Sequence, residues 1–159
     1  MKIIDNFLPP LEFSLLQNVL MGEDFPWFYN PYTLYPSQGN QKIYQFTSSL
    51  FKDGDLCYQF PALKTCLRKL NVKEIFRIKV NLNPRTVFHR NTGYHTDGWF
   101  NITTAVYYIN TNNGWTHIKG HGKVKSVANR IVIFDSNLEH AGFTCTDENT
   151  RVTVNFNYA

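Results

Sequence analysis

From Ile75 to the end of the chain, apolar residues recur at every second position, and this constrains the fold more than any other feature. The segment IFRIKVNL (75–82) alternates apolar with polar residues. Four further strand-like segments follow it: ITTAVYYI (102–109), GKVKSV (122–127), RIVIFDS (130–136) and RVTVNFNY (151–158). A period of two is that of a strand with one buried face. Short strands separated by turn-forming stretches such as NTNNG (110–114) and CTDEN (145–149) predict a sandwich or barrel.

The N-terminal part has a helical period instead. Two segments space their apolar residues as one helix face does: 11–20, through Leu11, Leu15, Leu16 and Val19, and 60–70, through Leu63, Cys66, Leu67 and Leu70. Pro61 suits the first turn of the second helix. Residues 25–40 are rich in Pro, Tyr, Asn and Gly and predict a loop. Helices followed by many strands predict an α+β chain that is mostly β.

Length and composition predict one globular domain over residues 1–159, with a helical lead-in over 1–74 and the β core over 75–159. No run approaches the ~18 apolar residues of a membrane span, and the N-terminus lacks a signal-peptide pattern. Three cysteines without CxxC spacing, Cys57, Cys66 and Cys145, predict reduced thiols and a cytoplasmic location. The net charge of +4 permits attraction to nucleic acid, but the basic residues are spread along the chain.

A histidine and an aspartate stand two residues apart in GYHTDGWF (93–100). In an extended segment, residues i and i+2 face the same side, so His95 and Asp97 could direct their side chains at one metal ion. His140 follows the apolar strand 130–136, and a barrel that gathers strand ends would place it opposite this pair. Two histidines and one carboxylate leave three positions open, which suits non-haem Fe(II) with a cosubstrate and O2. The alternative is a hydrogen-bonded surface pair.

Arg151 lies on the polar face of the last strand. Alternation sends Val152, Val154 and Phe156 to one side of this strand and Arg151, Thr153, Asn155 and Asn157 to the other. A guanidinium inside a small barrel needs an anionic partner. A dicarboxylate ligand held in a bidentate fork would supply it, and a surface salt bridge with Asp147 or Glu148 is the alternative.

Taken together, these motifs resemble the Fe(II)- and 2-oxoglutarate-dependent oxygenases, in particular their prolyl-4-hydroxylase-like branch. The motifs are HTD (95–97), TTAVYYIN (103–110), RIVIFDSNLEH (130–140) and RVT (151–153), and IIDNFLPP (3–10) resembles the usual lead-in. The resemblance covers about half of the chain, residues 75–159. It implies a double-stranded β-helix, a cupin-like jelly-roll barrel, with the N-terminal helices packed on one sheet.

The resemblance also implies roles for individual residues. His95, Asp97 and His140 would be the catalytic iron ligands. Arg151 would bind the C5 carboxylate of 2-oxoglutarate, with Tyr108 and Thr153 beside it.

The sequence departs from the family pattern in two places. Trp115 stands where a second glycine is common, and Asn81 and Asn83 lie on a strand where relatives often have a tyrosine. We therefore expect a different pocket for the prime substrate, with Asn81, Asn83 and Asn157 facing it. The loops 25–40 and 88–94 would frame its mouth.

The implied activity is hydroxylation of a C–H bond, for example in a peptidyl proline, with Fe(II), 2-oxoglutarate and O2 and with succinate and CO2 as co-products. The prime substrate would be a protein, a peptide or a small molecule. The alternatives are a cupin-like metal-binding protein or metalloenzyme that does not use 2-oxoglutarate, a binding module without metal, and an oxygenase that acts on nucleic acid. No membrane partner is expected.

Overall fold

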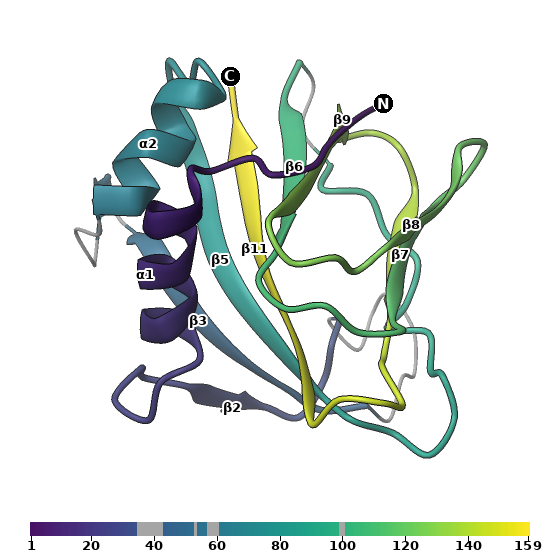
Figure 1. Ribbon diagram of the computed structural model, residues 1–159. Helices are drawn as coiled ribbons and strands as arrows, with labels where there is room; N and C mark the ends of the chain where they lie inside the picture. Colours follow the sequence, from purple (N-terminus) through teal and green to yellow (C-terminus); the bar gives the residue numbers. More distant parts are fainter. Residues whose placement is uncertain (35–42, 53, 57–60, 99–100) are drawn as a thin grey trace.

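The computed structural model describes residues 1–34, 43–52, 54–56, 61–98 and 101–159. Two antiparallel sheets and two helices make up the fold (Figure 1). The larger sheet consists of β1 (Lys2–Ile4), β2 (Phe28–Asn30), β3 (Gln45–Lys52), β4 (Asp55–Leu56), β5 (Ile75–Pro84), β6 (Thr103–Tyr108), β9 (Arg130–Asp135) and β11 (Thr150–Tyr158). The smaller sheet consists of β7 (Trp115–Ile118), β8 (Gly122–Lys125) and β10 (His140–Phe143).

The order of the larger sheet is β1-β9-β6-β11-β5-β3-β2, with β4 paired to β3, and that of the smaller sheet is β10-β7-β8. Strands distant in sequence are thus neighbours, as in a jelly roll. The predicted class, a mostly β chain folded as a double-stranded β-helix with helices on one sheet, is confirmed.

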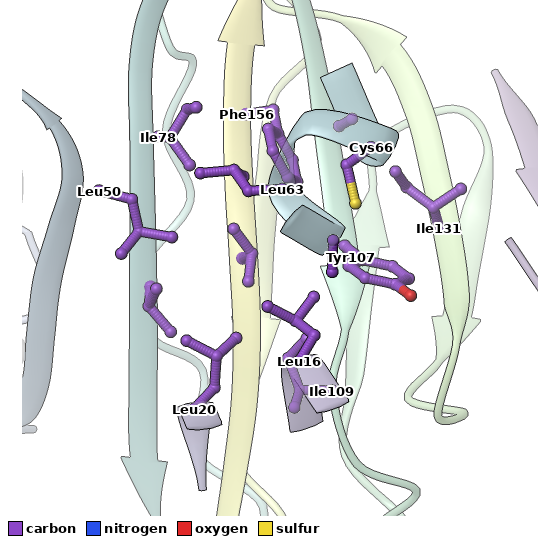
Figure 2. Packing of buried hydrophobic residues seen from close by; sticks show 14 of the residues in the cluster. Leu16, Leu20, Leu50, Leu63, Cys66, Ile78, Tyr107, Ile109, Ile131 and Phe156 are labelled. Carbon is purple, nitrogen blue, oxygen red and sulfur yellow. The ribbon is translucent and has the colours of Figure 1, made fainter. Parts of the chain in front are cut away.

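Helices α1 (Pro10–Leu20) and α2 (Pro61–Lys69) lie side by side against one face of the larger sheet (Figure 1). Leu16 and Leu20 of α1 and Leu63 and Cys66 of α2 meet apolar strand residues in one buried cluster (Figure 2). Pro61 opens α2, as predicted, where its missing N–H has no helical partner to lose. In the described part of the chain, neither helix is long and apolar enough to cross a membrane.

The buried face of α1 differs from the prediction. Leu16 is buried, but Leu11, Leu15 and Val19 are exposed, and Leu20 takes their place in the core. The helix packs through a narrower stripe than its apolar residues suggest, so its sequence pattern alone could not fix its orientation.

Some elements were not predicted. Residues 25–40 were expected to be loop, yet β2 lies within them and pairs with β3. Strands β3, β7 and β10 were also missed, and residues 35–40 and Cys57 lie outside the described residues.

Strand alternation places polar side chains on the face of the larger sheet that turns away from the helices. On β5, Ile78 and Val80 are buried against the helices. Four polar residues of the same strand instead line a pocket: Arg77, Lys79, Asn81 and Asn83. On β11 the predicted division holds, because Val152, Val154 and Phe156 join the helix-side core and Arg151, Thr153 and Asn155 line that pocket.

Candidate metal centre

Backbone pairing brings the two predicted histidine ligands side by side. The His95 amide donates to the His140 carbonyl at 3.0 Å, and the His140 amide donates back at 2.9 Å. The Asp97 amide donates to the Ser136 carbonyl at 3.0 Å. The segment around HTD thus runs beside β10, which begins at His140. The ligand atoms of His95, Asp97 and His140 all lie within 4.8 Å of one another.

Each imidazole is oriented by its Nδ1 atom. His95 Nδ1 lies 3.2 Å from the Gly93 carbonyl oxygen, and His140 Nδ1 lies 2.9 Å from that of Leu138. Donation by Nδ1 leaves Nε2 as the lone-pair atom of each ring, and each Nε2 is 3.9 Å from an Asp97 oxygen. His140 Nε2 is buried and has no hydrogen-bond partner among the described residues. Two nitrogen donors and a carboxylate in this arrangement fit Fe(II).

Three side chains hold the Asp97 carboxylate. Arg77 Nη2 donates to Oδ1 at 2.6 Å, whereas Thr104 Oγ1 and Asn157 Nδ2 donate to Oδ2 at 2.7 and 2.9 Å. Burial alone would raise the pKa of Asp97, but the Arg77 charge and the hydrogen bonds outweigh it and keep the pKa below its ordinary value. Burial, with His140 nearby, lowers the pKa of His95. At neutral pH the site therefore offers a carboxylate and a neutral imidazole, as metal ligation requires.

Asn157 faces inward as predicted, but its amide is already engaged. Nδ2 donates to Asp97 and Thr104, and Oδ1 accepts from Arg77 Nε at 2.8 Å. We infer from these contacts that Asn157 positions Asp97, while its contact with the prime substrate stays a prediction. Arg77 and Thr104 were not predicted as site residues, since nothing in their local pattern marks Asp97, 20 and 7 residues away, as a partner.

We expect Asn157→Ala to weaken Fe(II) binding by about 10- to 100-fold, because Asp97 loses a partner that orients it. An anaerobic Fe(II) titration followed by calorimetry measures this. Asn155→Ala is the matched control, since Asn155 lies two residues away on the same face of β11 and makes no hydrogen bond to Asp97. Equal Fe(II) affinity in the parent and the Asn157 variant would contradict this positioning role.

Two of the predicted cosubstrate residues, Arg151 and Thr153, line the same pocket as the three predicted metal ligands, and Tyr108 lies beside Arg151. The Arg151 side chain is buried, and its guanidinium donates from Nε to Ser126 Oγ at 2.9 Å and from Nη2 to Thr116 Oγ1 at 3.0 Å. No carboxylate pairs with it among the described residues. The hydroxyl of Tyr108 is also buried there without a hydrogen bond of good geometry, and the Tyr108 ring centroid is 5.6 Å from Arg151 Cζ. A buried cation beside an unpaired hydroxyl fits a carboxylate ligand.

Gly114 explains how Arg151 fits into this space. A Cβ on Gly114 would come within 2.8 Å of Arg151 Cδ and within 2.7 Å of the Phe143 carbonyl oxygen. A glycine is therefore required next to the arginine. The next residue, Trp115, stands where a second glycine was expected, and its ring stacks on that of Phe143 with centroids 4.5 Å apart.

The volume of this pocket is about 380 Å³. It is lined by His95, Asp97 and His140, by Arg151 and Thr153, and by Asn81 and Asn83. Its lining also includes Tyr32, Thr33 and Leu34 from the region 25–40 and Thr92 from 88–94, the two segments expected to frame the mouth. Thr33 Oγ1 donates to the Thr92 carbonyl at 2.6 Å and so links the two segments.

Lys79 is a pocket residue that the sequence analysis did not single out. Burial and the nearby Arg77 charge lower the pKa of Lys79 from 10.5 to about 8. The folded state therefore binds this proton less tightly than the unfolded state, and the charged amine destabilises the fold at neutral pH.

We expect Lys79→Met to raise the free energy of unfolding at pH 7 by about 1–3 kcal/mol. Because the folded pKa is the lower one, parent stability rises with pH between about 8 and 10.5, and the advantage of the variant shrinks over that range. Urea denaturation of the metal-free protein at pH 7 and pH 10 measures both effects. Lys125→Met, at an exposed position of β8, should change neither. A destabilising effect at pH 7 would contradict this account.

Comparison with solved structures gives matches over nearly the whole chain. The chain is similar to an oxidoreductase of the 2OG-Fe(II) oxygenase family from Burkholderia pseudomallei (10% identity, 99% of this chain, 84% of that chain, TM-score 0.69). It is also similar to a prolyl hydroxylase from Trichoplax adhaerens in complex with a hypoxia inducible factor peptide (17% identity, 99% of this chain, 82% of that chain, TM-score 0.64). A third similar structure is a prolyl-4-hydroxylase from Pseudomonas putida (14% identity, 99% of this chain, 91% of that chain, TM-score 0.62).

The chain has the fold of these oxygenases. No family model matches the sequence, and no curated protein does. The oxygenase fold is therefore seen in the three-dimensional arrangement, at identities of 10–17%.

Proposed function

We propose that the protein is an Fe(II)- and 2-oxoglutarate-dependent dioxygenase that hydroxylates a C–H bond. The observation that carries the proposal is Arg151, a buried cation without an acidic partner among the described residues, in one pocket with the His95–Asp97–His140 cluster. A metal-binding barrel that does not use 2-oxoglutarate has no need of this cation, which costs stability unless an anion binds to it.

Two groups of residues would have separate roles in this function. His95, Asp97 and His140 would hold Fe(II), and the carbonyls of Gly93 and Leu138 fix their imidazoles. Arg151 would grip the C5 carboxylate of 2-oxoglutarate, with Tyr108 and Thr153 completing its hydrogen bonds. When bound, Fe(II) with 2-oxoglutarate and O2 supplies the oxidising chemistry, with succinate and CO2 as products.

The prime substrate is proposed to be a peptide, a protein or a small molecule, with a peptidyl proline as one candidate. The fold shared with two prolyl hydroxylases supports that candidate. The rival function is that of a cupin-like metalloenzyme that does not use 2-oxoglutarate. We further propose a cytoplasmic location, which agrees with the buried free thiols of Cys66 and Cys145.

Succinate release tests the proposal. The protein is incubated with Fe(II), 2-oxoglutarate and O2 without any prime substrate, and succinate is measured by mass spectrometry. We expect slow release that depends on both Fe(II) and 2-oxoglutarate and is lost in Asp97→Ala. The same release from His121→Ala, altered at an exposed histidine outside the pocket, controls for handling. If 2-oxoglutarate neither binds nor is consumed, the rival function replaces the proposed one.

A further inference from the structure

Lys79 lies in the middle of β5 and lines the pocket. It pairs in register with Asn155 of β11 and Ser49 of β3. Arg77, two residues earlier on the same face, is bound to Asp97. Among the described residues, no hydrogen bond or ion pair engages the Lys79 ammonium, although the side chain is half-buried. A cation placed this way is unfavourable unless a ligand compensates it.

Side-chain amides near Lys79, on the pocket-lining face of β5 and β11, also have no hydrogen bonds to described residues. The Asn83 side chain is 4% exposed, and its Nδ2 has no hydrogen-bond partner in the described part of the chain. The side chains of Asn81 and Asn155 line the pocket and are likewise free of hydrogen bonds to described residues. Buried polar groups are nearly always paired in folded proteins. The wall formed by β5 and β11 therefore offers donors to a polar ligand.

The balance of charge identifies the kind of ligand. Asp97 is the only acidic residue among the described residues that line the pocket, and Arg77, Lys79 and Arg151 are its basic ones. On the proposed function, Fe(II) adds two positive charges and 2-oxoglutarate adds two negative ones. Asp97 and 2-oxoglutarate then carry three negative charges, against five positive charges on the metal and the three basic residues. Two positive charges remain without a counterion.

We propose that the prime substrate carries an anionic group, a carboxylate or a phosphate, which Lys79 binds beside the metal centre. Arg77 adds to the positive potential there while holding Asp97. The unused amides of Asn81 and Asn155 donate to the same group or to polar atoms next to it. This inference rests on the proposed function, because the charge count includes its metal and cosubstrate.

Paired probes that differ only in charge test the inference. The carboxylate pair is N-acetyl-aspartate amide with N-acetyl-asparagine amide, and the phosphate pair is N-acetyl-O-phosphoserine amide with N-acetyl-serine amide. Binding to the full-length protein with Fe(II) and 2-oxoglutarate is measured by calorimetry without O2. We expect at least one acidic probe to bind about tenfold or more tightly than its uncharged counterpart, as a charge-assisted hydrogen bond provides. The pair that shows the preference identifies the anion.

Substitutions assign that preference to Lys79. In Lys79→Met the preference should disappear while the affinities for Fe(II) and 2-oxoglutarate are kept, and Lys79→Arg should restore part of it. Lys125→Met removes the same charge from an exposed strand position and should keep the preference.

Three results would overturn the inference. The first is equal affinity within both probe pairs, including no measurable binding of any probe. The second is a preference that survives in Lys79→Met. The third is a Lys79→Met variant that loses affinity for 2-oxoglutarate instead, which would place Lys79 in the cosubstrate site. Succinate release in the absence of probes distinguishes these failures from failure of the proposed function, because it does not depend on the prime substrate.

Discussion

Arg151→Ala is expected to weaken binding of 2-oxoglutarate by roughly 30-fold or more. A bidentate arginine–carboxylate pair is a charge-assisted contact, and loss of one buried partner costs on the order of 2–5 kcal/mol. At ~1.4 kcal/mol per decade of affinity, even the lower value gives a clear loss. Calorimetric titration of the Fe(II)-loaded protein with 2-oxoglutarate, without O2, measures the change.

Two comparisons make this result specific. Arg151→Lys should recover only part of the affinity, because an ammonium cannot reproduce the planar fork. Arg130→Ala, which removes an ion pair to the exposed Asp5 at 2.6 Å, should leave 2-oxoglutarate binding unchanged. Fe(II) binding should survive in all three variants and shows that they are folded. Parent-like 2-oxoglutarate affinity in Arg151→Ala would remove the cosubstrate assignment and favour the cupin-like function.

His140→Ala is expected to lower Fe(II) affinity by more than about 100-fold, because loss of a ligand should exceed the 10- to 100-fold cost of losing a residue that only orients one. The His140 side chain is 4% exposed, against 24% for that of His95, so an added water molecule replaces its Nε2 poorly. Anaerobic Fe(II) titration gives the affinity.

His121→Ala, at an exposed position, is the matched control and should bind Fe(II) as the parent does. A His140→Ala variant with parent-like Fe(II) affinity and an unchanged melting temperature would show that the three side chains do not form the metal site.

Alternation predicted the division of β11 into an apolar and a polar face, because β11 is a regular strand. His95 and Asp97 lie outside the named strands, and His95 forms an isolated β-bridge with His140. Predicting the position of His140 needed one further assumption, that a barrel brings the strand ends together.

The missed features have physical reasons. Strand β3 contains a register shift between Ser49 and Phe51, so its apolar residues do not alternate. Strand β10 has four residues, HAGF, too few to show a period. The pattern of β5 separates Arg77 and Lys79 from Ile78 and Val80, but the same pattern describes a solvent-facing strand. Only the position of Asp97, which Arg77 contacts at 2.6 Å, shows that the polar face is the inside of the barrel.

Reciprocal main-chain hydrogen bonds join His95 and His140. Each residue holds the other through its main chain, so the spacing of the two positions does not depend on either imidazole. A different side chain at either position would therefore occupy the same place in the barrel. The backbone thus fixes the two positions, and a single substitution can change the chemical group at one of them without changing the other.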